Sequence, residues 1–155
     1  MMSMESETQN SLDDKFERSV SLLAWAYNEE ELIGEFLDRA VALLESCVSE
    51  WEIVLVNDCS TDRTLEIVQN WMAREPRIRI VNHPRNLNVG WACRNAVKNA
   101  QNDIIFWQTV DWSYDLKNLR LFLELTKHYD VVQGIRPTPI RLFSYIPGLR
   151  SLYRV

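Results

Sequence analysis

The sequence predicts an α/β fold in which a mostly parallel sheet is covered by helices on both faces. Short continuous apolar runs, typical of strands buried on both sides, alternate with segments whose apolar residues recur at helical spacing. The alternation continues as a βαβαβαβαβ series, which implies parallel strands joined by right-handed crossovers. Ligands of such sheets bind at the carboxyl ends of the strands, so candidate site residues are those that follow each strand.

Three regions differ in composition. Residues 1–18 are polar and acidic without apolar periodicity, and we expect a disordered lead-in there. Residues 19–135 carry the alternating pattern and form the expected α/β domain, for which a chain of 155 residues with 46% hydrophobic content is sufficient. Residues 136–155 contain several prolines, and every charge in them is an arginine. We expect this last segment to lead towards a further half of the protein.

The first half of the α/β region predicts two strands and two helices. Val20–Ala26 is a continuous apolar run, and Asn28 with Glu31 has the spacing of a capping box that opens a helix. The apolar positions of that helix are Leu32, Ile33, Phe36, Leu37, Ala40, Leu43 and Leu44. Trp51–Val56 is the second strand. A second helix, with Ile67, Val68, Trp71 and Met72 on its apolar face, ends before Pro76.

The second half repeats the pattern with shorter elements. A strand at Ile78–Val81 leads into an Asn-rich loop, and small residues at 92, 96 and 100 give the next helix a face for close packing. We expect a fourth strand at Asp103–Trp107, a helix at Leu116–Lys127 and a fifth strand at Asp130–Gln133. Three of the six tryptophans fall inside predicted strands or helices, which predicts core positions for Trp51, Trp71 and Trp107.

Composition excludes several classes of protein. The net charge is −5 and basic residues are scattered up to the last twenty positions, so we expect no nucleic-acid partner. The three cysteines show no CxxC spacing, which indicates reduced thiols in a cytoplasmic protein. No stretch approaches the ~20 apolar residues that cross a bilayer. The alternation of arginine with apolar residues in 136–155 suits peripheral contact with an anionic membrane or a lipid phosphate, and equally suits packing on a further half of the fold.

Polar side chains at the strand ends are the candidate site residues. Tyr27 follows the first strand and is either a ring that stacks on a base or a core anchor. Asp58 follows the second strand and can accept a hydrogen bond from a uracil or guanine edge, whereas Ser60, Thr61 and Asp62 suit helix capping. Asp111 follows the fourth strand and is either a ligand of a metal that bridges two phosphates or a helix cap.

Three motifs together resemble glycosyltransferase family 2. LLAWAYNEEELIGEFL resembles its opening strand and helix, EIVLVNDCSTDRTLEIV resembles its Val-Asp-Asp-Gly-Ser-Thr-Asp-x-Thr segment, and RNLNVGWACRNAVKNAQNDIIFW resembles its Asn-rich loop, Ala-rich helix and following strand. The resemblance covers about residues 19–134 and is nearest in character to dolichyl-phosphate-mannose-synthase-like members. It implies the GT-A fold, a Rossmann-like three-layer sandwich.

The resemblance also implies roles for individual residues. Ala26, Tyr27 and Glu29 would line the base and ribose pocket, Asp58 would read the base, and the Arg94 region would flank the diphosphate. Outside the metal motif, the sequence departs from the family pattern at four positions, where Trp25 replaces proline, Asn57 replaces aspartate, and Cys59 and Asn88 replace glycine.

The family's Asp-x-Asp metal motif becomes Thr109-Val110-Asp111 here, which leaves one carboxylate. We expect Asp111 to bind Mg²⁺ or Mn²⁺, with Gln108 as a neutral oxygen ligand. Inverting transfer needs a general base, and no Asp, Glu or His follows Gly134. The base is therefore expected beyond Val155, and the chain is expected to be a truncated donor-binding half.

The resemblance implies transfer of a sugar from a UDP- or GDP-sugar to a polyprenyl phosphate or a glycan, as in cell-envelope or polysaccharide biosynthesis. The alternative is a non-catalytic module that binds a nucleotide sugar. A receiver-like or dinucleotide-binding domain is disfavoured because no GxGxxG follows the first strand and the chain has only four glycines. An incomplete fold would expose a sheet edge and apolar faces, which predicts self-association.

Overall fold

The structure is a computed structural model that describes residues 15–134, and it confirms the α/β fold. Four parallel strands form one sheet in the order β3-β2-β1-β4. The strands are β1 (Val20–Ala26), β2 (Trp51–Asn57), β3 (Ile78–Asn82) and β4 (Ile104–Trp107). The helices are α2 (Ile33–Cys47), α3 (Thr64–Met72), α4 (Asn88–Asn99) and α5 (Leu119–Leu125).

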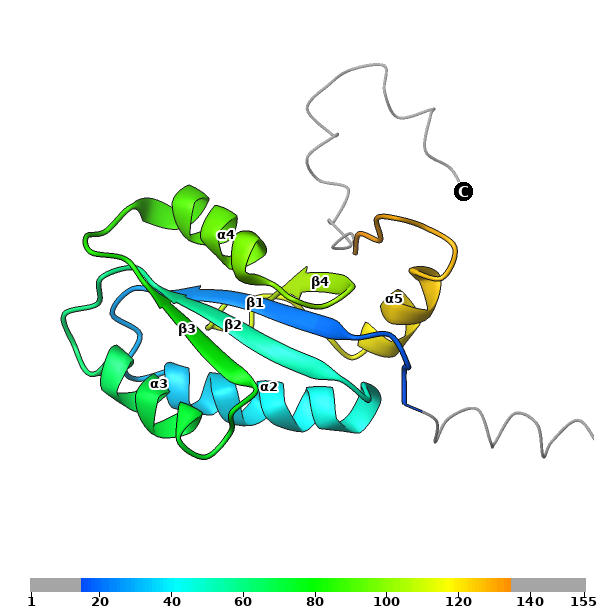
Figure 1. Cartoon of the computed structure of the whole chain (residues 1–155). Coiled ribbons are helices and arrows are strands. Elements are labelled where there is room, and N and C mark those ends of the chain that lie inside the picture. Colours follow the sequence, from blue (N-terminus) through cyan, green and yellow to red (C-terminus); the bar gives the residue numbers. More distant parts are fainter. Residues whose placement is uncertain (1–14, 135–155) are drawn as a thin grey trace, which may run out of the picture.

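Helices cover both faces of the sheet, so the molecule has three layers (Figure 1). The larger core lies between the sheet and α2, α3 and α5, where Phe36, Leu37 and Leu55 are fully buried. The smaller core lies under α4, where Ala92 and Ala96 pack on Leu23. Alanines on the buried face of α4 let the helix backbone approach the sheet closely, as the small-residue pattern predicts.

The strand register explains which side chains enter each core. Leu23 of β1 pairs with Val54 of β2 and with Trp107 of β4, and paired residues of parallel strands point to the same face. Both β1 and β2 are inner strands with helices on each side. All seven residues of β2 are therefore buried, as a continuous apolar run predicts.

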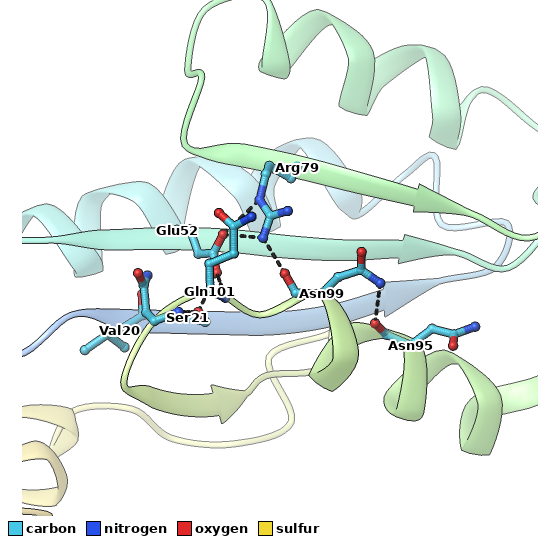
Figure 2. Close-up of polar contacts among 8 residues, drawn as sticks. Val20, Ser21, Glu52, Arg79, Asn95, Asn99 and Gln101 are labelled. Atoms are coloured by element: carbon cyan, nitrogen blue, oxygen red, sulfur yellow. Dashed lines mark hydrogen bonds and ion pairs between the residues drawn. The ribbon is translucent and has the colours of Figure 1, made fainter.

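A buried carboxylate holds the end of the sheet at which the strands begin (Figure 2). Glu52, on the α4 face of β2, is 7% exposed and accepts hydrogen bonds from Ser21 Oγ at 2.6 Å and from the Gln101 backbone N–H at 2.7 Å. Arg79 of β3 forms an ion pair with Glu52 at 2.6 Å and also donates to the Asn99 carbonyl. The network satisfies a charge that would be costly to bury alone, and it ties the end of α4 to the sheet.

The ordered unit begins earlier than expected, because Phe16 is buried at 3% exposure. Its backbone N–H donates to Cys47 O and its carbonyl accepts from Ser49 N–H, which forms a bridge beside Val48. The expectation of disorder up to residue 18 is therefore wrong for Phe16, whose side chain belongs to the larger core. Residues 1–14 lie outside the described part of the chain, as does the basic segment 136–155.

The last two predicted elements differ from the structure. The helix α5 is shorter than predicted, and residues 131–134 pair with no strand among the described residues. The expected fifth strand at Asp130–Gln133 is thus wrong for this part of the chain. Val131 is 82% exposed, so its apolar side chain has no covering layer that would favour a buried strand.

Two tryptophan predictions are confirmed and one is wrong. Trp51 is buried and Trp71 packs against the larger core, but Trp107 is 50% exposed. Trp107 points to the α4 face from the edge strand β4, while α4 packs mainly on β1 and β2. The three cysteines are free, and no helix within residues 15–134 is long and apolar enough to cross a membrane.

Candidate functional site

A pocket of about 380 Å³ opens at the carboxyl ends of β1, β2 and β4, beside the start of α4. This is the edge at which ligands of parallel sheets bind. Its wall contains Trp25, Ala26, Tyr27, Glu29, Asp58, Asn86, Asn88, Val89, Thr109, Val110 and Asp111. Five of the seven predicted site residues therefore lie in one cavity, although they come from three strand ends.

The loop after β1 and the loop after β2 are joined by hydrogen bonds of their own side chains. These bonds are Asn28 N–H to Ser60 Oγ, Thr61 N–H to Asn28 Oδ1, Glu29 N–H to Thr64 Oγ1, Glu30 N–H to Asp62 Oδ2 and Arg63 N–H to Glu30 Oε2. They span 2.8–3.0 Å and link residues more than thirty positions apart. The loop that carries Tyr27 and Glu29 into the pocket is therefore fixed to the loop after β2 without any ligand.

These contacts replace the capping that the sequence predicts. The helix α2 begins at Ile33 with no side-chain cap, and Asn28 bonds to the neighbouring loop, so the predicted capping box is wrong. The helix α3 likewise begins at Thr64 without a capping side chain at Arg63. Only Asp62 acts locally, by accepting the Thr64 N–H at 3.0 Å. Pattern alone did not distinguish a cap from a bond between loops, because the same residue types serve both.

Tyr27 is 48% exposed on the pocket wall, so it is not the core anchor that was one of its two interpretations. Ala26 lies beside it and is buried at 2% exposure. Both residues line the pocket. The half-exposed Tyr27 ring is a surface on which a planar base can stack.

Asp58 is 5% exposed, and its carboxylate is held by two donors. His83 Nδ1 lies 2.6 Å from Asp58 Oδ1, and the Leu87 N–H donates to the same oxygen at 2.8 Å. Burial opposes ionisation, but the hydrogen bonds from Leu87, His83 and the Asn88 backbone outweigh it and hold the pKa of Asp58 below its usual value. Asp58 is therefore an ionised acceptor at neutral pH in a nearly dry position.

Glu29 and Asp111 face the same cavity from two loops. Burial raises the pKa of Glu29, and the negative charges of Asp111 and Asp62 raise it further. Hydrogen bonds from the hydroxyl groups of Ser113 and Thr109 instead lower the pKa of Asp111, which is exposed. The alternative that Asp111 caps the next helix is wrong, because its carboxylate accepts from Ser113 N–H and Oγ while α5 begins only at Leu119.

Gln108 and Arg94 do not line the pocket. Gln108 is fully buried, its Nε2 donates to the Tyr114 carbonyl at 2.8 Å, and its Oε1 accepts the Thr109 N–H at 3.0 Å. Both polar atoms of the Gln108 amide are bonded within the turn that follows β4. The expectation that Gln108 supplies a neutral ligand to a metal is therefore wrong. Arg94 is exposed on α4, with its guanidinium 5.7 Å from the Trp91 ring.

Sequence reasoning missed the side chains that support Asp58 from behind. His83 was one residue of an Asn-rich loop, and Asn95 was one polar position of a helix. Asn95 Nδ2 lies 2.8 Å from His83 Nε2, so the two residues and Asp58 form one chain of hydrogen bonds. The only available signal was that a buried carboxylate needs a partner and that the chain has two histidines.

Comparison with known proteins decides the family. Residues 21–147 match the family described as Glycosyl transferase family 2, which is most of the chain. The chain belongs to glycosyl transferase family 2. This confirms the resemblance inferred from the three motifs, and the four departures from the family pattern therefore lie within a family 2 domain.

Individual relatives agree with the family assignment. Dolichyl-phosphate beta-glucosyltransferase ALG5C of Trichomonas vaginalis is 40% identical over 91 residues, covering 56% of this chain and 27% of the relative. An undecaprenyl-phosphate 4-deoxy-4-formamido-L-arabinose transferase of Edwardsiella ictaluri is 32% identical over 127 residues, covering 80% of this chain and 39% of the relative. This family 2 chain thus spans less than half the length of these relatives.

A solved structure supports the GT-A fold. A mannosyltransferase from Pyrobaculum calidifontis, in complex with GDP-Man and Mn²⁺, aligns with a TM-score of 0.61 at 24% identity. The alignment covers 71% of this chain and 33% of the mannosyltransferase. The family 2 domain described in Figure 1 is therefore the sheet and flanking helices of a GT-A glycosyltransferase.

Within residues 15–134, this family 2 domain has no group of three or more His, Cys, Asp or Glu side chains that could hold a metal ion. Asp111 and Glu29 are the carboxylates that line the pocket besides Asp58. A magnesium-type ion on a diphosphate commonly takes one or two carboxylates, with phosphate oxygens and water as its remaining ligands. The residues present fit such a shared site, and they do not fit a metal site built from protein ligands alone.

Proposed function

We propose that this domain binds a nucleotide diphosphate sugar, a UDP- or GDP-sugar, as the donor half of an inverting glycosyltransferase. One observation carries the proposal. In a family 2 chain, an exposed ring at Tyr27, a buried ionised carboxylate at Asp58 and an exposed carboxylate at Asp111 line a single pocket at the strand ends. These three groups match a base, its hydrogen-bonding edge and a diphosphate.

The base would stack on the Tyr27 ring, with its edge toward Asp58. Uracil presents an N3–H donor and guanine presents adjacent N–H donors, and an ionised carboxylate accepts either. Because Asp58 is buried and ionised, a base that presents an acceptor to it would gain no hydrogen bond and would face the repulsion of a negative charge. Asp58 therefore supplies base selectivity, and Tyr27 supplies stacking that is less selective.

The diphosphate would lie toward Asp111, with Glu29 at its side. A bound Mg²⁺ or Mn²⁺ would offset the negative charge that develops on the leaving diphosphate. Asp111 is suited to hold the ion because it is already ionised and oriented by Ser113. Glu29 would ionise more readily beside a cation, which opposes the charges that now raise its pKa.

A lipid phosphate is the acceptor that the relatives favour. Both relatives described above carry a polyprenyl phosphate in their names, dolichyl phosphate in one and undecaprenyl phosphate in the other, although their sugars differ. We propose that the whole protein transfers its sugar to a polyprenyl phosphate at the cytoplasmic face of a membrane. A glycan acceptor is the alternative, and the arginine-rich residues 136–155 would contact lipid phosphate only in the first case.

Thermal unfolding with added nucleotides tests the donor site. UDP, GDP and their sugar conjugates are titrated with and without Mn²⁺ into the wild-type chain, Asp58→Asn and Asp111→Asn. The matching nucleotide is expected to raise Tm, by the equivalent of about 2.7 kcal/mol at a hundredfold excess over Kd. Asp58→Asn should remove the rise, and Asp111→Asn should remove its dependence on Mn²⁺.

Asp103→Asn is the matched control, since Asp103 is exposed and precedes β4 at the opposite end of the sheet. It should behave as the wild type does. A nucleotide-induced rise that persists in Asp58→Asn, or is lost in Asp103→Asn, would contradict the proposed site.

A non-catalytic nucleotide-sugar-binding module is the second candidate. The observation that favours it is that Thr109 replaces a carboxylate of the metal motif while Gln108, its neighbour, is fully buried. Slow release of nucleoside diphosphate from the bound donor, dependent on Mn²⁺, separates the two candidates. Release would support a competent metal site, and tight binding without release would support the module.

A further inference from the structure

A chain of three side chains leads from the wall of the pocket into the body of the fold. Asp58 follows β2, His83 follows β3, and Asn95 lies on α4. The His83 side chain is 3% exposed and that of Asp58 is 7% exposed, so the imidazole ring and the carboxylate are both shielded from water. The backbone of His83 is fixed as well, because its N–H donates to Asn57 O at 2.9 Å.

The direction of the hydrogen bonds determines which imidazole nitrogen carries the proton. Asn95 Nδ2 is a donor only, so His83 Nε2 accepts from it at 2.8 Å. His83 Nδ1 must then carry the hydrogen, which it donates to Asp58 Oδ1 at 2.6 Å. The Leu87 N–H donates to the same oxygen. These donors, together with the Asn88 backbone N–H, orient the carboxylate of a residue that lines the pocket.

We propose that His83 is a positioning residue that orients Asp58 toward the nucleotide base, and that Asn95 selects the neutral Nδ1–H tautomer which makes this possible. The inference rests on the proposed nucleotide-binding function, because it assigns Asp58 to the base. Its residues lie behind the pocket wall, and neither His83 nor Asn95 lines the cavity. Base affinity thus depends on a residue of α4 that no ligand would touch.

The tautomer is measured directly by ¹⁵N NMR of the imidazole. The chain has two histidines, so His128→Asn leaves His83 as the sole imidazole in the spectrum. We expect a ring with hydrogen on Nδ1 and a lone pair on Nε2. Asn95→Asp replaces the amide donor with an acceptor and should convert the ring to the doubly protonated form. A doubly protonated ring or an Nε2–H tautomer in the His128→Asn chain would overturn the assignment.

Binding of UDP and GDP to position-83 variants tests the link to the base. His83→Leu removes the donor to Asp58 and should weaken binding of the matching nucleotide about tenfold or more. His83→Gln places its amide near the Nε2 position and should be similarly weak. His83→Asn places an amide donor near the Nδ1 position and should retain affinity within about threefold of the wild type. His128→Asn is the control and should match the wild type.

The outcomes separate the inference from the function on which it rests. If the wild type binds no nucleotide, the proposed function fails, and the NMR result still decides the tautomer. If the wild type binds and folded His83→Leu binds equally well, the positioning role is wrong. Equal weakness of folded His83→Asn and His83→Gln would also overturn it, because a donor restored at the right atom should rescue binding.

Discussion

At the scale of single residues, the turns after the strands contain left-handed backbone without glycine. Asn28 has a φ of 56°, Cys59 of 64°, Asn88 of 67° and Trp112 of 54°. Asparagine tolerates this region, but a Cβ of most other residues is strained there. Cys59 and Asn88 are two of the positions where the family pattern has glycine. The replacement of glycine at these two positions therefore keeps the turn conformation but adds backbone strain that glycine would not have.

Replacing Cys59 by glycine should relieve this strain. We expect Cys59→Gly to raise the free energy of unfolding by about 0.5–1 kcal/mol, since the strain removed exceeds the added entropy of the unfolded glycine. Urea unfolding measures the change. Cys59→Ala is the control, because it removes the thiol and keeps the Cβ. An equal gain in both variants would assign the effect to the thiol instead of the backbone.

The buried carboxylate of Glu52 should make a large contribution that depends on pH. Burial opposes its ionisation, but the bonds from Ser21, Gln101 and Arg79 prevail and lower the pKa of Glu52. A folded pKa below the unfolded value stabilises the protein above the unfolded pKa of about 4.3, and this stabilisation is lost as pH falls through the folded pKa. Glu52→Gln should therefore cost about 3 kcal/mol at pH 7 and progressively less in acid.

Urea unfolding at several pH values checks this expectation. Glu66→Gln is the matched control, because the Glu66–Arg63 pair is exposed on both sides and should contribute little. A Glu52→Gln penalty that stays constant down to pH 3 would show that the loss comes from packing and does not come from charge.

Site residues were predictable where they come directly after a strand in the sequence. The positions of Tyr27, Asp58 and Asp111 at the pocket follow from the parallel order of the strands, which brings their carboxyl ends together. The prediction that Gln108 is a metal ligand was wrong because side chains alternate in direction along and just beyond a strand. The Gln108 amide points inward and supports the next turn. His83 was not predictable because its partner lies 25 residues away in sequence.

At the scale of elements, the inner strands and α2 were the most predictable. Seven consecutive buried residues in β2 and a regular apolar face on α2 are signals that tertiary contacts reinforce. The region after β4 was less predictable, because it is covered on fewer sides. Helix α5 has seven residues, and the apolar residues after it remain exposed at Val131, so apolar character there did not imply a strand.

The close packing of α4 gives a prediction at this scale. Ala96 is fully buried against the sheet, and the space between helix and strands is set by its methyl group. Ala96→Leu should lower the free energy of unfolding by about 1–3 kcal/mol through overpacking. Val97→Leu, one position along on the exposed side, should remain close to wild type. Chemical unfolding compares them, and a neutral Ala96→Leu would mean that α4 is not held tightly on the sheet.

At the scale of the whole molecule, strand β4 forms a sheet edge that carries exposed apolar side chains. Ile105 is 41% exposed and Trp107 is 50% exposed, both on the face beside α4, and β4 pairs only with β1 among the described residues. Unpaired edges that carry apolar side chains favour association. We expect the chain to self-associate in sedimentation velocity as concentration rises, and Trp107→Arg to reduce this association. Val131→Arg is the control and should have no such effect, because Val131 is an exposed apolar residue that pairs with no strand within residues 15–134.

The proposed binding site for a nucleotide diphosphate lies at the carboxyl ends of β1, β2 and β4. The most direct test is a titration of the ¹⁵N-labelled chain with UDP and with GDP, in the presence of Mg²⁺, followed by backbone amide chemical shifts. We expect saturable shifts at residues 26–29, 58, 86–89 and 109–111, with little change around Ser21 and Glu52 at the opposite end of the sheet. Shifts confined to that opposite end, or no shifts with either nucleotide, would contradict it.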